Sequence, residues 1–187
     1  MLTLLLSLAL SADPILESDA EALVRNAKEL SAALEAVKQP LPEAVRKVIA
    51  DGKASQVEDA LEPHVLFATT INPEGRVKIA RGSADAVLKA GQPMYAIVKV
   101  ENQSGGQQKL TAHGTYAGSA ESPFDVRFET VGKVTPELVG HFTEYRLLRI
   151  TCSKAGKREL TLGFDAGQGT QDLGFRGVVP VLFEVKP

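Results

Sequence analysis

The spacing of apolar residues along the chain changes near Pro63. Before this proline, apolar positions recur every three or four residues, which is the period of an amphipathic helix. After it, short runs alternate apolar and polar positions, which is typical of strands with one buried face. The sequence therefore predicts an α+β fold, with a helical segment over residues 13–62 and a β domain over residues 63–187.

The first helix is expected to begin at Ser18, because Ser18 and Glu21 have the spacing of a capping box. Its apolar stripe consists of Leu23, Ala27, Leu30, Leu34 and Val37. Read as a heptad repeat, this stripe would form a coiled coil or bind a partner helix, but it covers barely two heptads. Helices this short rarely persist without tertiary packing. We therefore expect Leu30 and Leu34 to be buried, either against the β domain or against a second copy of the chain.

Two further helices are predicted before the β domain. Pro42 is well placed as the first residue of one, and Gly52 is a natural stop for it. Ser55 and Glu58 repeat the capping-box spacing and predict a third, short helix. Pro63 is expected to end this last helix.

The β domain is expected to begin with a hairpin. Residues 64–71 and 76–79 read as its strands, and Asn72, Pro73, Glu74 and Gly75 form the turn between them. Further strands are predicted at residues 86–89, 94–101, 109–116, 124–130, 141–152, 158–164 and 178–186. Seven to nine short strands with this spacing predict an antiparallel, immunoglobulin-like β-sandwich.

The first ten residues, MLTLLLSLAL, form an apolar run that is too short to span a bilayer as a helix. Small residues follow this run, as at the cleavage site of a secretory signal peptide, although no Lys or Arg precedes Arg25. We therefore predict a signal peptide at residues 1–12, cleaved after Ser11 or Ala12. The protein would then be exported to the periplasm, the cell surface or the medium, with no transmembrane span in the mature chain. The alternative is that the run packs on the domain.

Charge and composition exclude some classes of partner. The chain of 187 residues has a net charge of −2, so no global basic field attracts nucleic acid. It has no Trp, and aromatic residues make up only 5%, which leaves little for stacking sugars or bases. Residues 13–62 carry eleven acidic and six basic side chains, whereas residues 63–187 carry twelve acidic and fifteen basic ones. Weak attraction between the two parts is therefore expected.

No catalytic set is apparent from the sequence. His64, His113 and His141 are the only histidines, and none has a metal-binding spacing, although they could still converge in the fold. The loop from Asp165 to Asp172 is rich in glycine and holds two carboxylates, too few for a calcium site, so a flexible turn is favoured. Cys152, the only cysteine, reads as a small core residue. We predict a protein that is not an enzyme and that holds no metal or other cofactor.

A basic strip lies beside the predicted hairpin. It consists of Arg76, Lys78 and Arg81, and residues two apart on a strand share one face. The strip could contact an anionic glycan, a partner protein or the acidic helical segment. It could equally be a solvated strand face that discourages edge pairing. We retain these three residues as the candidate anion or partner contact.

Two stretches resemble a known kind of domain. Residues 71–82, INPEGRVKIARG, and residues 173–183, LGFRGVVPVLF, are similar to an amino-terminal β-domain that precedes the catalytic module of some secreted bacterial PHP-like metallohydrolases. The resemblance covers roughly residues 63–187 and implies an accessory or binding role. The histidine clusters of the catalytic module have no counterpart in this chain, so hydrolase activity is not carried over.

These observations favour an exported, non-catalytic binding or structural domain of the bacterial cell envelope. Its partner would be a protein or a glycan at the envelope. One alternative is a metal-assisted hydrolase, or its accessory module, built on histidines that meet only in the fold. Another alternative is a protein that assembles through the helical stripe.

Overall fold

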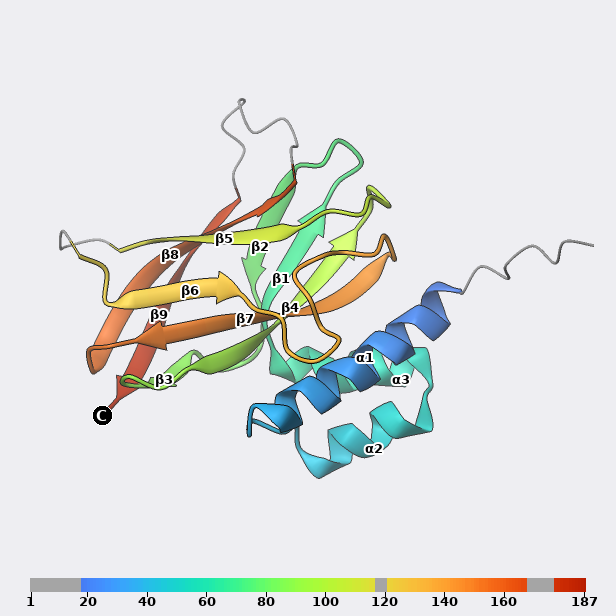
Figure 1. Ribbon diagram of the computed structural model, residues 1–187, viewed down its shortest axis with the longest axis horizontal. Helices are drawn as coiled ribbons and strands as arrows, with labels where there is room; N and C mark the ends of the chain where they lie inside the picture. Colours follow the sequence, from blue (N-terminus) through green and yellow to red (C-terminus); the bar gives the residue numbers. More distant parts are fainter. Residues whose placement is uncertain (1–17, 117–120, 168–176) are drawn as a thin grey trace, which may run out of the picture.

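The structure is a computed structural model that describes residues 18–116, 121–167 and 177–187. Within these residues, three helices lie on one side of two stacked sheets that contain nine strands (Figure 1). The predicted signal peptide at residues 1–12 lies outside the described residues. None of the described helices is both long and apolar enough to cross a membrane.

The first helix, α1 (Asp19–Ala36), begins as predicted. The Ser18 hydroxyl accepts a hydrogen bond of 3.3 Å from the Glu21 amide, and the Glu21 carboxylate accepts one of 3.1 Å from the Ser18 amide. These two bonds confirm the capping box. The bond from the Ser18 amide, together with one of 3.0 Å from the Ser18 hydroxyl, holds the pKa of the Glu21 carboxyl below its ordinary value.

The second helix, α2 (Glu43–Asp51), follows Pro42 and ends at Gly52, which has a φ of 73°. The third, α3 (Ala54–Leu61), is followed by the short 3₁₀ turn η1 (Glu62–His64). The predicted second capping box is wrong, since no side chain caps α3. Gly52 has already turned the chain, so α3 begins two residues later and Ser55 falls inside its first turn.

The sheet under the helices has the order β2 (Val77–Arg81), β1 (Val65–Ile71), β4 (Met94–Asn102), β7 (Thr143–Cys152) and β6 (Phe124–Phe128). The other sheet has the order β3 (Val87–Lys89), β9 (Val178–Lys186), β8 (Gly156–Ala166) and β5 (Leu110–Thr115). The predicted β1–β2 hairpin is confirmed, and Gly75 in its turn has a φ of 77°.

The β-rich α+β class is as predicted, but the sheets are mixed rather than antiparallel. β1 pairs with β4 in parallel, and β3 pairs with β9 in parallel. The hairpin places β2 on one edge of β1, which leaves the other edge for β4. Because β3 crosses to the second sheet before β4 begins, the chain returns to β1 in its original direction.

Two apolar clusters hold the layers together. The first lies between the sheets and includes Phe67, Phe164 and Phe183, together with Cys152, which is buried as expected. The second joins the helices to the five-stranded sheet. Leu30 and Leu34 are 0% and 3% exposed there, which confirms the prediction that they are buried. The helical stripe is thus covered by strands of its own chain.

A side chain of α1 replaces a missing strand beside β7. The edge strand β6 pairs with β7 only as far as Leu148, so no strand among the described residues lies on that side of the start of β7. Asn26 Oδ1 accepts a hydrogen bond of 2.6 Å from the Tyr145 amide at this place. A buried backbone N–H without a partner is costly, so this contact fixes where α1 lies.

Gln39, in the linker after α1, serves a second unpaired stretch in the same way. β1 meets β4 only from Ile97 onward, which leaves the first residues of β4 without a described strand on that side. The Gln39 side chain accepts a bond of 3.0 Å from the Tyr95 amide and donates one of 2.8 Å to the Pro93 carbonyl. The helical layer therefore completes the hydrogen bonding of the sheet as well as covering it.

Replacement of Asn26 with alanine is expected to destabilise the protein by about 1–3 kcal/mol, because it leaves the Tyr145 amide without an acceptor. The amide of Tyr145 should also exchange with solvent faster. Denaturant unfolding and hydrogen exchange measure the two effects. Asn26→Asp keeps a side-chain acceptor at this position and is the control. Equal loss in both variants would show that the helix turn itself, rather than this bond, is affected.

Candidate functional site

A cleft of about 310 Å³ lies between α1 and the loop that leads into β7. Its helical wall carries Arg25, Asn26 and Glu29, and its loop wall carries Lys133, Thr135 and Glu137. The two walls thus present acidic, basic and neutral polar groups to one another. A concave site with several convergent polar groups is the usual form of a small-molecule site.

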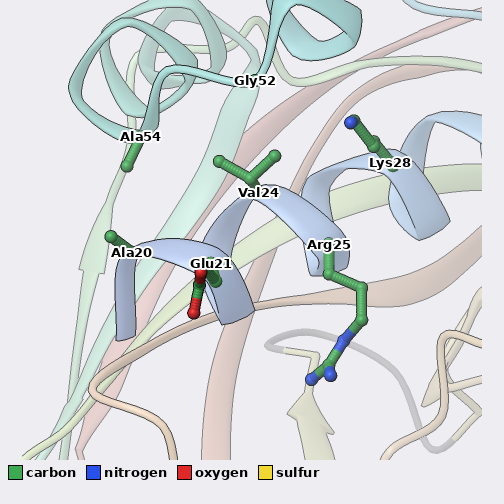
Figure 2. Close-up of a pocket in the computed structure, with 7 residues that line it drawn as sticks. All are labelled: Ala20, Glu21, Val24, Arg25, Lys28, Gly52 and Ala54. Carbon is green, nitrogen blue, oxygen red and sulfur yellow. The ribbon is translucent and has the colours of Figure 1, made fainter. Parts of the chain in front are cut away.

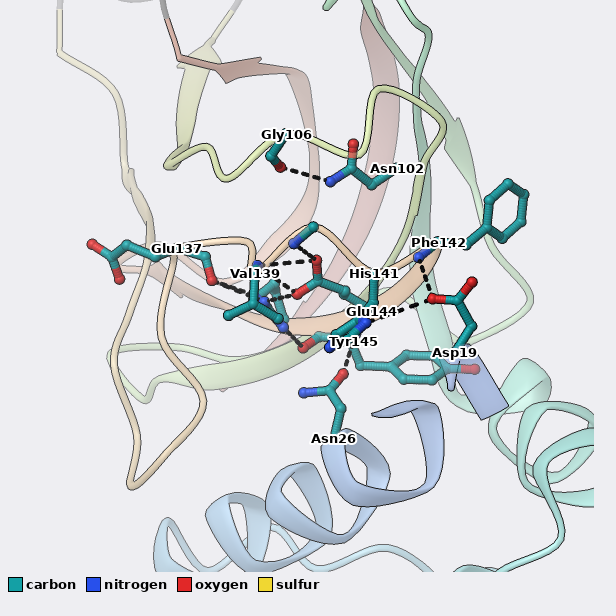
Figure 3. A network of polar contacts seen from close by, with 12 residues as sticks. Asp19, Asn26, Asn102, Gly106, Glu137, Val139, His141, Phe142, Glu144 and Tyr145 are labelled. Carbon is teal, nitrogen blue, oxygen red and sulfur yellow. Dashed lines mark hydrogen bonds and ion pairs between the residues drawn. The ribbon is translucent and has the colours of Figure 1, made fainter. Parts of the chain in front are cut away.

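The floor of the cleft is a buried ion pair between Glu144 and Arg146, which are 1% and 4% exposed. The Glu144 carboxylate also accepts hydrogen bonds of 3.0–3.1 Å from the amides of Val139 and Gly140 (Figure 3). Arg146 donates to the Glu137 carbonyl at 2.8 and 3.2 Å, and to the Tyr145 carbonyl at 2.8 Å. The pair therefore fastens the loop to β7.

Burial lowers the pKa of the Arg146 guanidinium, and the neighbouring Glu144 carboxylate opposes part of that change. A guanidinium starts from so high a pKa that it stays charged at neutral pH. The N–H groups of Arg146 donate to backbone carbonyls and to the Glu144 carboxylate of the same chain. This ion pair is consequently a structural clamp and not an acid–base couple.

The first turn of α1 contacts the loop beside the cleft. Asp19 Oδ1 lies 3.5 Å from His141 Nδ1 and accepts a 3.4 Å hydrogen bond from the Phe142 amide (Figure 3). Two apolar side chains of the same loop stand in solvent beside this contact, since Val139 is 52% and Phe142 49% exposed. The mouth of the cleft is therefore partly apolar, whereas its interior is polar.

A wider groove lies on the other side of α1, against the start of α3 (Figure 2). It has a volume of about 410 Å³, and Ala20, Val24 and Ala54 give it a largely apolar surface. In Figure 2 the charged ends of Arg25 and Lys28 point in different directions. Because its polar groups do not converge, we take the polar cleft as the candidate site.

The three histidines lie in different surroundings. His64 lines a smaller cavity of about 180 Å³ near Tyr95, and His141 belongs to the polar cleft. His113 lies on β5 in the other sheet, where its Nε2 contacts the Asp165 carboxylate of β8. No three potential ligands among the His, Cys, Asp and Glu residues that the structure describes come together to hold a metal ion. The described residues thus do not form the three-histidine site considered from the sequence.

The glycine-rich loop from Asp165 to Asp172 is described only in part. Asp165 is the penultimate residue of β8, is 9% exposed, and contacts His113 through its carboxylate. Residues 168–172, including Asp172, lie outside the described residues.

The predicted basic strip is divided between two faces of β2. Lys78 is exposed and pairs with Thr70 across the hairpin, and Arg76 precedes the strand on the same face. Arg81 lies three residues after Lys78 and therefore on the opposite face of β2. Its guanidinium donates to the carbonyls of Leu66 at 2.7 Å and of Gly82 at 3.1 Å, and it also contacts the Ala84 carbonyl. Arg81 therefore supports the chain at the end of the hairpin.

A cation on the outer face of β4 joins the helical layer to the sheet. Lys99, with a side chain only 13% exposed, lies 2.6 Å from Glu58 and 3.6 Å from Glu62. This contact is one instance of the expected attraction between the acidic helices and the basic strands. Burial alone would lower the pKa of Lys99, but the bond to Glu58 and the charges of Glu58, Glu62 and Glu101 outweigh it and raise that pKa.

Lys99→Met should therefore lower the free energy of unfolding by about 0.5–1 kcal/mol at pH 7. A raised lysine pKa stabilises the fold below the unfolded value of about 10.4, and this contribution is lost as the pH rises through the folded pKa. The free energies of unfolding of the two proteins should thus differ at pH 7 and converge once the pH exceeds the raised pKa of folded Lys99. Lys53→Met, at an exposed site, is the control. A difference that persists at high pH would point to lost packing of the lysine stem.

Glu144 and Arg146 were not singled out from the sequence. They occupy alternate positions in a strand, where polar residues usually face solvent. The one hint is that Leu147 and Leu148 interrupt the alternation directly after them, which indicates a strand covered on both faces.

Two solved structures are distantly similar to the chain. It aligns with domains 4 and 5 of the S-layer protein SbsC at 14% identity, over 60% of this chain and 59% of that chain, with a TM-score of 0.31. It aligns with an extracellular fragment of EsaA from Streptococcus gallolyticus at 13% identity, over 90% of this chain and 44% of that chain, with a TM-score of 0.32. The chain spans less than two thirds of either structure, and TM-scores this low carry no argument. No protein-family model and no curated protein matches the sequence.

Proposed function

We propose that this protein is an exported, non-catalytic binding or structural domain of the bacterial cell envelope. The observation that carries the proposal is the set of hydrogen bonds that the buried ion pair of the polar cleft makes to the loop backbone. Glu144 and Arg146 direct their hydrogen bonds at the backbone of the adjoining loop, so they hold a rigid polar recess in place. A pre-formed recess serves binding, and its partner would be a protein or a glycan of the envelope.

Export is supported by the N-terminal apolar run of the sequence. We also propose that the two sheets form a sandwich of the immunoglobulin-like kind, since they enclose one common apolar cluster. The resemblance to the amino-terminal domain of PHP-like metallohydrolases also supports a binding or accessory role. Lys78 and Arg76 remain the proposed contact for an anion or partner outside the cleft.

One rival function is favoured by a specific contact. The His113–Asp165 pair, with the histidine side chain half exposed, is an arrangement that metal-assisted hydrolases also use. Elemental analysis of protein purified without added metal decides between the non-catalytic domain and the metal-assisted hydrolase. Stoichiometric zinc that is lost in His113→Ala would favour the hydrolase. The assembly alternative has lost its main support, because the helical stripe is buried within one chain.

Fractionation of the native host tests the proposal directly. We expect intact-mass analysis to show cleavage after Ser11 or Ala12, and we expect the mature protein to sediment with isolated envelope fragments. A cytoplasmic protein that retains Met1 would contradict export. An exported protein that stays in the supernatant at every salt concentration would contradict a role at the envelope.

A further inference from the structure

Two opposite charges in the polar cleft lack partners of their own. Glu29 is half-buried on the helical wall, and Lys133 is exposed on the loop wall. Within the described part of the chain, neither side chain forms an ion pair or a hydrogen bond, although Glu29 acts through space on the Arg146 guanidinium.

The other charges of the cleft are engaged. Glu144 and Arg146 bind each other, and Glu137 Oε1 lies 3.6 Å from Lys109 Nζ, outside the cleft. Arg25 and His141 also have interaction partners. One carboxylate and one ammonium, on opposite walls, are therefore left to recognise a ligand.

We propose that the cleft binds a small zwitterion of dipeptide size, with its ammonium group at Glu29 and its carboxylate at Lys133. This inference rests on the proposed binding function. A ligand of one sign would meet a like charge on one of the walls, which is a penalty that a zwitterion avoids. The volume of about 310 Å³ lies at the lower end of the range for small-molecule sites, which suits a ligand of this size.

The remaining lining fits the same ligand. The side-chain amide of Asn26 and the hydroxyls of Thr135 and Thr143 lie in the cleft. They supply hydrogen-bonding groups for the N–H and C=O of a peptide bond. Val139, which is 52% exposed, offers a small apolar surface that suits a short side chain.

Both walls are held in place before any ligand arrives. Asn26 fixes α1 to β7, and Glu144 fixes the loop through the amides of Val139 and Gly140. A site that is already ordered loses little conformational entropy on binding. Weak, partly exposed ion pairs can therefore yield measurable affinity, on the order of millimolar.

Nuclear magnetic resonance titration of the full chain with dialanine, in its L,L and D,D forms, tests the proposal. Saturable changes in chemical shift are expected for the backbone amides of Asn26, Val139 and Thr143. Acetylation of the ligand amine or amidation of its carboxyl group should each weaken binding about two- to fivefold, as expected for one exposed ion pair. Blocking both ends should weaken binding by the product of the two effects, about 4- to 25-fold. Absence of saturable shifts, saturation outside the cleft, or equal binding of the doubly blocked ligand would overturn the proposal.

Two neutralising variants identify which wall binds which end. Glu29→Gln should remove the preference for the free amine over the acetylated ligand, and Lys133→Gln should remove the preference for the free acid over the amide. Lys47→Gln, on the exposed face of α2, is the matched control and should change neither preference. Retention of both preferences in both variants would overturn the assignment. If the titration fails while the protein still sediments with envelope fragments, the ligand class is wrong and the proposed function stands.

Discussion

Replacement of Leu30 with alanine is expected to lower the free energy of unfolding by about 2–4 kcal/mol, as large-to-small changes in a core do. Leu30 is 0% exposed and lies in the cluster that joins α1 to β1, β4 and β7. The alanine would leave a cavity there, because the sheet beneath is held by its strand ladders and cannot collapse into the space. Urea or guanidinium unfolding of both proteins gives the difference.

Glu35→Ala is the matched control for Leu30→Ala, since Glu35 lies on the exposed face of the same helix. It should change the unfolding midpoint little. An unchanged midpoint for Leu30→Ala in a monomeric protein would mean that the helices are a loosely tethered arm. The helical stripe would then be available to a partner, and assembly through it would become the leading hypothesis.

Replacement of Arg146 with methionine is expected to cost about 3–5 kcal/mol, because it leaves the Glu144 carboxylate buried without a counter-charge. Glu144 is 1% exposed, so water cannot easily replace the guanidinium. The loss should reach the loop too, since Arg146 also donates to the Glu137 carbonyl. Hydrogen exchange at Val139 and Gly140 should become faster in this variant.

A double variant separates the charge effect from the loss of packing. Glu144→Gln together with Arg146→Met removes both charges and should destabilise the protein by less than the sum of the two single changes. Additive losses would show that the two side chains act independently. A wild-type unfolding midpoint for Arg146→Met would mean that the cleft floor is wetter than the structure shows.

Local signals in the sequence were sufficient to place many of the elements. The strand predicted at residues 178–186 is β9 with the same bounds, and the predicted hairpin is β1 and β2. The capping box at Ser18 and the stop at Gly52 also predicted helix ends correctly. Each of these signals depends on residues within a few positions of one another, where backbone preference and apolar period act directly.

Long-range pairing could not be inferred in the same way. The parallel pairing of β1 with β4 depends on which edge the hairpin leaves open, and nothing within either strand encodes that. Asn26 and Gln39 look like ordinary polar residues of a helix and a linker, although they satisfy distant strands. The polar cleft combines α1 with a loop more than a hundred residues later in the chain, so no short sequence motif predicts it.

The bond from Tyr145 to Asn26 has a consequence for biogenesis. The two residues are 119 positions apart, so α1 is synthesised first and cannot dock until β7 has followed it. While α1 is undocked, the start of β7 is an open edge, which is a template for pairing with another chain. Other sheets protect such edges with local charges or bulges, whereas this one relies on α1. Partially folded chains should therefore aggregate through β7, and prompt docking of α1 is what prevents it.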